Sequence, residues 1–388
     1  MLRIKRLSNN TVKMANTAER FTSLDVFRGM TVCFMIIVNT PGSGAEAWGP
    51  LNHADWIGFT PTDLVFPSFL FAVGNALSFS KAKYESNTAF LAKVFKRTVI
   101  IFLLGYLMYW FPFFHRVDNE WVFNSVANTR IMGVLQRIAL CYFFGSLIVH
   151  YCTQKTAIII SALLLISYWV FLVYFGEASK EYTMLGNAGT RLDKLIIGDA
   201  HLYHKGGGPI AFDPEGLLST MTSIVNVIGG FLAGSYLQKK GKNYESVAML
   251  LVCGALLICT ALFWGQFLPV SKKMWTSSFS LLTIGIDLAT LGCLILAIEI
   301  KNIRWGTSFF LIFGRNPLAI YLLSELLLAP LQLLWVCPEL SVFDWINQVF
   351  YQRIFPGSLG AFVFAMSYML LCWVVAYILD KRRIYIKI

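Results

Sequence analysis

Long apolar runs are the feature that most constrains what this chain can fold into. A helix needs roughly 20 mostly apolar residues to cross the hydrocarbon core of a bilayer, and ten segments of the sequence approach that length with few charges. Only helices and closed barrels satisfy every backbone hydrogen bond inside a membrane. We therefore expect an all-α, polytopic membrane protein with about ten transmembrane helices, at residues 24–41, 64–80, 97–113, 131–150, 156–175, 217–237, 246–268, 276–299, 307–330 and 358–379.

The composition agrees with a membrane protein. Hydrophobic residues make up 57% of the chain and charged residues 14%, whereas soluble domains carry about 25% charged residues. The formal net charge of +11 could suggest a nucleic-acid partner, but the basic residues lie in short clusters between the apolar runs. Membrane topology explains that distribution better. We expect the lipid bilayer as a partner, and no nucleic acid.

The distribution of Lys and Arg predicts the orientation in the membrane, because cytosolic loops are enriched in these residues. With the N-terminus in the cytosol, most of the 32 Lys and Arg residues fall on the cytosolic side. Both termini are then cytosolic, with a tail at 1–23 that is not a cleaved signal peptide and another at 381–388. Between them we expect one transmembrane domain, residues 24–380, with outer loops at 42–63 and 176–216.

The first expected span contains three polar side chains, although a charge in hydrocarbon costs at least ~2.5–3.5 kcal/mol. Asp25 and Arg28 are three residues apart and could pair on a helix. Alternatively, Arg28 helps to hold an anionic ligand that arrives from the cytosol. Asn39 ends the span on the outer side, where it could cap the helix or take part in chemistry.

Later spans also contain charged residues. Arg137 and Asp287 lie within two of them, and Arg315 and Asn316 stand directly before Pro317. A Gly-Arg-Asn-Pro sequence inside an apolar run indicates a broken helix that lines a polar cavity. The simpler alternative is a buried ion pair of Asp287 with one of the two arginines. Together these residues suggest a polar or ligand-filled path between the helices.

The outer loop 42–63 holds the most suggestive titratable group. His53 lies between turn signals, with Asp55 and Asp63 nearby. A histidine at a membrane surface is often structural, but its ordinary pKa near 6.5 also suits proton transfer at neutral pH. His201 and His204 form an HxxH pair without an HExxH motif or partner cysteines, so we expect no metal site.

Two other polar motifs precede later spans. Asp213 and Glu215, in "FDPEGLLST", are explained by the ordinary chemistry of a helix start. Lys272, Lys273 and Trp275, in "SKKMWTSSF", are explained by a Trp belt at the membrane interface with flanking lysines.

Six motifs, in this order, resemble the heparan-α-glucosaminide N-acetyltransferase family: "SLDVFRGMTVCFMIIVNTPG", "LNHADWIGFTPTDLVFPSFLFAVG", "GVLQRIALCY", "DPEGLLST", "SKKMWTSSF" and "GRNPLAIY". The resemblance extends from about residue 20 to about residue 380. It implies a multi-span enzyme that takes acetyl from acetyl-CoA on the cytosolic side and places it on the amine of a terminal glucosamine on the other side. We expect the chain to lack the large extramembrane portion of the lysosomal enzyme. We therefore expect the small bacterial form, in the inner (plasma) membrane.

The resemblance also implies residues of the active site. The family's catalytic histidine, in the outer loop after the first core span, matches His53, and an asparagine at the end of that span matches Asn39. We expect His53 to act as the general base and Asp55 or Asp63 to orient its ring. Asn39 would donate a hydrogen bond to the oxyanion or the thioester carbonyl. His53 could instead carry the acetyl group covalently.

Coenzyme A is polyanionic, so its phosphates should lie near basic residues or helix N-termini on the cytosolic side. The candidates are Arg28, Arg304, Arg315, Asn316 and Arg137. The co-substrates expected are acetyl-CoA and a glucosamine-type saccharide, with a homodimer possible by analogy with the family. Two other functions remain open from the sequence: an amino-sugar transporter, and an O-acyltransferase that acts on envelope polysaccharide.

Overall fold

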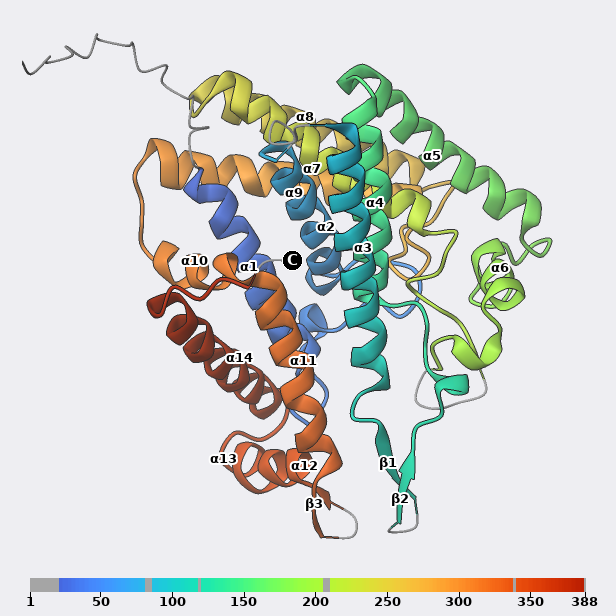
Figure 1. The fold of residues 1–388 in the computed structure, drawn as a ribbon, viewed down its shortest axis with the longest axis vertical. Helices are drawn as coiled ribbons and strands as arrows, with labels where there is room; N and C mark the ends of the chain where they lie inside the picture. Colours follow the sequence, from blue (N-terminus) through green and yellow to red (C-terminus); the bar gives the residue numbers. More distant parts are fainter. Residues whose placement is uncertain (1–20, 81–85, 118–119, 205–209, 338–339, 387–388) are drawn as a thin grey trace, which may run out of the picture.

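The chain folds almost entirely into helices. The computed structural model describes residues 21–80, 86–117, 120–204, 210–337 and 340–386 (Figure 1); the expected tail at 1–23 lies almost wholly outside them. All ten segments expected to span a membrane contain a helix, as the all-α prediction requires. The helices are α1 Thr22–Asn39, α2 Val65–Ser78, α3 Asn87–Trp110, α4 Val134–Tyr151, α5 Gln154–Phe175, α6 Ala188–Ile196, α7 Thr220–Lys240, α8 Tyr244–Trp264, α9 Ser277–Leu294, α10 Thr307–Arg315, α11 Pro317–Leu333, α12 Val342–Ile346, α13 Gln352–Ile354 and α14 Ser358–Lys381.

Fewer than ten of the described helices are long and apolar enough to cross a bilayer by themselves. Seven meet that condition: α1, α4, α5, α7, α8, α14, and α9 with its π-helical continuation to Ile300. The helices α10 and α11, bent by 83° at their junction, make an eighth if they count as one span. Helix α2 has only 14 residues, and α3 carries Lys93, Lys96 and Arg97 in its first half. A count of ten spans therefore stays a prediction.

Helix α7 lies at the centre of the bundle. In its most apolar window 72% of the residues are buried, against 17% in α5 and 28% in α8. The buried face of α7 is rich in Ser, Thr, Asn and Gly, whereas α5 and α8 are strongly apolar. This is the distribution expected in a membrane, where peripheral helices face lipid and small or polar residues join helices in the interior.

Glycines bring α2 into backbone contact with α7. A Cβ atom at Gly74 would lie 1.9 Å from the carbonyl oxygen of Val227, and one at Gly230 would lie 2.0 Å from that of Phe71. No side chain fits at either position. Because the two helices touch so closely, the start of α2, which contributes to the site described below, is fixed relative to α7.

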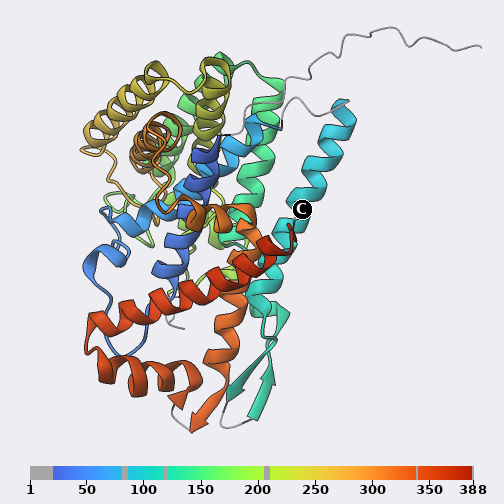
Figure 2. The same cartoon turned by 90° about the vertical axis from the view of Figure 1, so that its left-hand side faces the viewer.

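The loops expected on the outer side meet at one end of the bundle, called here the His53 end. Trp56 Nε1 donates to the carbonyl oxygen of Tyr182 at 2.6 Å, and Ser271 Oγ donates to that of Trp56 at 2.6 Å. Two hairpins also project from this end (Figures 1 and 2). They are β1 Phe114–Val117 with β2 Glu120–Phe123, and β3 Trp335–Cys337 with β4 Leu340–Ser341.

Both ends of the described chain contact the segments that flank α10, and this part of the bundle, where Arg28 donates to the carbonyl oxygen of Gly314, is called here the Arg28 end. Ser23 N donates to Glu299 Oε1 at 3.0 Å. Asn316 Nδ2 donates to the carbonyl oxygen of Ile384 at 2.9 Å. The number of crossings and the compartment that each chain end meets stay predictions.

Candidate active site

A short 3₁₀-helix, Pro61–Leu64, places a buried carboxylate directly before α2. Thr60 and Asp63 form a capping box, in which Asp63 Oδ2 accepts from Thr60 N at 3.0 Å and from Thr60 Oγ1 at 3.1 Å. Ala54 N donates to the same oxygen at 3.2 Å. Asp63 is fully buried. Its Oδ2 is thus committed to holding the loop, and Oδ1 is left for a different partner.

That partner is His53, whose Nδ1 lies 2.7 Å from Asp63 Oδ1. An ionised carboxylate only accepts hydrogen bonds, so Nδ1 carries the proton and Nε2 presents a lone pair. The His53 side chain is 39% exposed, which leaves it accessible to a substrate. The sequence offered Asp55 or Asp63 as the partner of the ring, and the structure places Asp63 beside it. Asp55 is exposed, and only its backbone carbonyl makes a hydrogen bond in the described chain, to Lys273.

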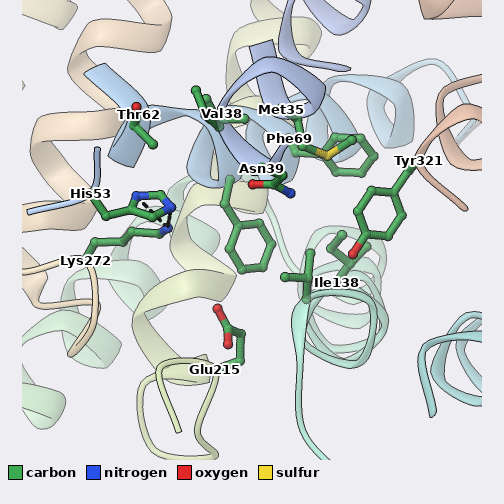
Figure 3. Close-up of a pocket in the computed structure, with 13 residues that line it drawn as sticks. Met35, Val38, Asn39, His53, Thr62, Phe69, Ile138, Glu215, Lys272 and Tyr321 are labelled. Atoms are coloured by element: carbon green, nitrogen blue, oxygen red, sulfur yellow. Dashed lines mark hydrogen bonds between the residues drawn. The ribbon is translucent and has the colours of Figure 1, made fainter. Parts of the chain in front are cut away.

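Lys272 also reaches His53, from the turn before α9. Its Nζ lies 3.0 Å from Nε2 and 3.1 Å from Nδ1 of the imidazole (Figure 3). Burial and the charge of Lys272 lower the pKa of His53, although the hydrogen bond to Asp63 opposes them. Burial likewise lowers the pKa of Lys272. Burial opposes ionisation of Asp63, but its hydrogen bonds with His53 and Thr60 hold its pKa below the ordinary value.

These groups face a pocket built by segments that are far apart in the sequence. In Figure 3, His53 and Lys272 stand on one side of the pocket, Tyr321 on the other, and Glu215 points in from below. Asn39, the last residue of α1, also lines it, and its Nδ2 donates to Glu325 Oε1 at 3.3 Å. The lining residues are Met35, Val38, Asn39, His53, Thr62, Val65, Phe66, Phe69, Val134, Ile138, Glu215, Lys272 and Tyr321.

Glu215 is held in place by a buried ion pair. Arg130 Nη2 donates to Glu215 Oε2 at 2.5 Å and to Asp213 Oδ1 at 2.6 Å. Burial opposes ionisation of Glu215, but the nearby arginines outweigh it and keep its pKa below the ordinary value. Asp193 Oδ1 accepts from Leu217 N at 2.9 Å. The loop is therefore fixed from two sides, and a charged carboxylate faces the pocket.

Comparison with known proteins shows which family this chain resembles. A family model described as heparan-alpha-glucosaminide N-acetyltransferase, catalytic, matches residues 20–189. The chain is 26% identical over 367 residues to the heparan-alpha-glucosaminide N-acetyltransferase of Mus musculus, which covers 80% of this chain and 54% of that protein. It is 24% identical over 433 residues to the Homo sapiens protein of the same name, covering 97% of this chain and 61% of that protein.

The resemblance to this family is confirmed. The matched range contains His53, Asp63 and Asn39, whereas Glu215 and Lys272 lie beyond it. The chain spans 54% to 61% of the length of these two relatives.

Arg137, expected near CoA, instead lies beneath the pocket. It is fully buried. It donates to Ser219 Oγ and to the carbonyl oxygen of Gly216, the latter at 2.9 Å, and its guanidinium lies 5.0 Å from the ring centre of Trp275. A side chain enclosed by protein in this way holds the Glu215 loop and is not placed to meet a phosphate. The expectation for Arg137 is corrected accordingly.

The other three basic candidates and Asn316 lie away from His53. Arg28 is 3.5 Å from Asp25, the pair expected from the sequence, and donates to the carbonyl oxygen of Gly314 at 3.3 Å. Arg315 pairs with Asp380 at 2.5 Å. Asn316, one of the buried residues, follows Arg315 directly at the bend between α10 and α11. Arg304 is exposed in the segment before α10.

A second cavity runs along α1 from Phe27 to Val38 and has mostly apolar walls. It shares Val38, Thr62 and Val65 with the first pocket. Asp287 lies in its wall and accepts from Ser68 Oγ at 2.5 Å. The alternative of an ion pair between Asp287 and an arginine is therefore wrong.

Glu215 and Lys272 are not among the site residues predicted from the sequence. Each was explained as local chemistry at a helix start or at the membrane interface. Both belong to motifs of the resemblance, "DPEGLLST" and "SKKMWTSSF", and that was the available signal. Their convergence on His53 depends on contacts across as many as 219 residues.

Proposed function

We propose that this chain is a membrane-embedded N-acetyltransferase that moves acetyl from acetyl-CoA to the amine of a glucosamine-type sugar. One observation supports it above all: the His53–Asp63 pair opens its Nε2 into a pocket lined by Asn39, in a chain that resembles an acetyltransferase family. A base held in one tautomer by a buried carboxylate is the arrangement that proton removal requires.

The reaction follows from these groups. The neutral amine attacks the thioester carbonyl carbon, a C–N bond forms, and the carbonyl electrons move to the oxygen. His53 Nε2 takes the amine proton, and the charge of Asp63, 2.7 Å away, stabilises the resulting imidazolium. When the intermediate collapses, the C–S bond breaks and the thiolate takes the proton from His53. A general base in this role contributes typically 10²–10⁴-fold.

Asn39 supplies a donor on the pocket wall. One of its amide N–H groups is directed at Glu325. The other can meet the thioester carbonyl oxygen, a contact that strengthens as that oxygen becomes negative. An acetyl-histidine intermediate is the alternative route. Acid quenching of the protein after mixing with acetyl-CoA alone, followed by mass spectrometry of the His53 peptide, separates the two.

Glu215 favours an amine over a hydroxyl as the acceptor. Its ionised carboxylate faces the pocket (Figure 3). A sugar amine arrives largely as an ammonium ion, which a carboxylate attracts, whereas a hydroxyl gains no comparable charge interaction. This supports N-acetylation over O-acylation of an envelope polysaccharide.

Acetyl-CoA would reach His53 along the second cavity. That cavity follows α1 from Phe27 to Val38, a rise of about 16 Å at 1.5 Å per residue. The mostly apolar walls of this cavity suit an extended pantetheine arm. With the Arg28 end in the cytosol, Arg28, Arg304 and Arg315 would lie on the side where the nucleotide arrives, and the acceptor would meet His53 at the outer face of the plasma membrane.

The test is transfer of labelled acetyl from acetyl-CoA to glucosamine-ended saccharides by the purified protein in detergent. We expect turnover with amine acceptors, little with the matched hydroxyl sugar, and a loss of at least 100-fold in His53→Ala. His115→Ala, in the β1 strand, is the matched control. Turnover by His53→Ala at the wild-type rate would overturn the proposal. Uptake of amino sugar into liposomes without acetyl-CoA would favour a transporter.

A further inference from the structure

The turn that carries Lys272 is held in a strained shape. Trp275 has a φ of 50°, a region that costs a bulky residue free energy and is tolerated where its surroundings force it. Trp275 is fully buried, donates from Nε1 to Asn226 Oδ1 at 3.2 Å, and donates from N to the carbonyl oxygen of Lys272 at 3.0 Å. Thr276 N donates to the carbonyl oxygen of Ser271 at 3.1 Å and so closes the turn. Strain of this kind is concentrated at functional sites.

The strained turn directs two neighbouring lysines to different partners. Lys273 Nζ donates to the backbone carbonyl of Asp55 and helps to hold the loop. Lys272 Nζ instead lies against the His53 ring, 3.0 Å from Nε2. A lysine whose role is only to hold the loop would donate to a backbone carbonyl, as Lys273 does. Lys272 is placed where a proton is to be taken up, and its charge opposes protonation of the imidazole.

We infer that Lys272 is a catalytic residue, whose ammonium group stabilises the oxyanion formed when the acceptor amine attacks the thioester. The inference rests on the proposed function and adds a group to it. The family model ends at residue 189, so this half of the site comes from outside the matched range.

The geometry of the reaction explains the position of Lys272. The amine nitrogen must hydrogen-bond to His53 Nε2, and the oxyanion is bonded to the carbon that this nitrogen attacks. A cation 3.0 Å from Nε2 is therefore within a short side-chain movement of the oxyanion. Substrate entry replaces the Lys272 hydrogen bond to Nε2 by that of the amine and frees the ammonium for the oxygen. The same charge keeps His53 unprotonated and disfavours the ammonium form of the amine once it is at the base.

Lys272→Met tests the inference, with Lys273→Met as the matched control. Removing a donor to an oxyanion lowers kcat by ~10²–10³-fold elsewhere, and we expect a similar loss, with the KM for acetyl-CoA changed only a few-fold. Lys273→Met should stay within a few-fold of the wild-type kcat. Lys272→Arg keeps the charge and should recover part of the activity.

The pH profile gives a second readout, which tests whether the charge of Lys272 acts on the base. The charged groups around His53 are Asp63, Lys272 and Lys273, with Glu215 across the pocket. Lys272 lowers the pKa of His53, so its removal should move the acidic limb of kcat to higher pH. A weakly basic amine acceptor keeps the substrate's own titration out of the range. Lys272→Arg should leave the limb where it is in the wild type.

The outcomes are separable from those for the proposed function. Absence of transfer by the wild type contradicts the proposed function itself. An active wild type with kcat of Lys272→Met within threefold of Lys273→Met, and an unmoved acidic limb, overturns the role of Lys272 alone. If Lys272→Met loses its thermal transition, Lys272→Gln, whose side chain is one atom shorter and ends in a neutral hydrogen-bond donor, is expected to show the same loss of kcat. Wild-type kcat in Lys272→Gln overturns the inference equally.

Discussion

Replacing Asp63 by asparagine should disable His53 by reversing its tautomer. Asp63 Oδ2 accepts three hydrogen bonds, from Ala54 N, Thr60 N and Thr60 Oγ1, at 3.0 to 3.2 Å. Oδ1 meets the imidazole at 2.7 Å. An asparagine has one oxygen and one NH₂ group, and the three donors draw its oxygen to the Oδ2 position. The NH₂ group then donates to His53 Nδ1, so Nε2 becomes the protonated nitrogen.

A His53 ring with its proton on Nε2 takes no proton from the acceptor amine. The expected loss in kcat is the contribution of a general base, ~10²–10⁴-fold, which equals about 2.7–5.4 kcal/mol at 1.36 kcal/mol for each factor of ten. The fold should change little, because the three hydrogen bonds to the Oδ2 position are kept.

The assay is steady-state transfer at saturating acetyl-CoA, with thermal unfolding in detergent measured on the same samples. Asp55→Asn is the matched control: it makes the same chemical change in the same loop, at an exposed carboxylate. We expect Asp55→Asn to stay near the wild-type rate. If Asp63→Asn unfolds at the wild-type temperature and its kcat lies within tenfold of the wild type, the tautomer argument is refuted.

Three further predictions concern pH, charge and packing. Because burial and Lys272 lower the pKa of His53, the base stays neutral until the pH falls below the ordinary value of 6.5, and kcat for a weakly basic acceptor should be flat above that value and decline below it. Arg130→Gln leaves two buried carboxylates without their cation, and unfolding should become easier by ~3–5 kcal/mol; thermal unfolding is the measurement, and the exposed Arg191→Gln, which should be neutral, is the control. Gly230→Ala forces a methyl group onto a backbone oxygen and should reduce the yield of monodisperse protein in gel filtration, whereas Gly229→Ala, which meets only the end of an isoleucine side chain, should be tolerated.

The helices could be predicted from the sequence because a run of apolar residues specifies a helix locally. The break before Pro317 was also readable, since a proline disrupts the preceding turn, and the structure shows a bend of 83° there. The span count was less secure. Because α2 is short and α3 carries basic residues in its first half, length and composition alone do not mark either helix as a span, although their cores are apolar.

The residues of the site also differ in how far the sequence predicts them. His53 and Asp63 are ten residues apart, and one short turn brings them together. Lys272 meets His53 only because the turn before α9 packs against the loop before α2, and no local pattern encodes that contact. Arg137 shows the opposite error. A charge in an apolar run was taken to indicate a ligand, but its role is to tie α4 to the loop at Gly216.

The distance in sequence between the parts of this pocket determines when the site can exist. The imidazole and its carboxylate come from the first 63 residues, the carboxylate on the pocket floor is at residue 215, and the lysine is at residue 272. A growing chain that has inserted only its first spans contains His53 but not yet Glu215 or Lys272. The pocket closes when the turn before α9 docks, so the proposed acetyl transfer must wait until most of the protein is in the bilayer. On this view the protein becomes active only as its insertion nears completion.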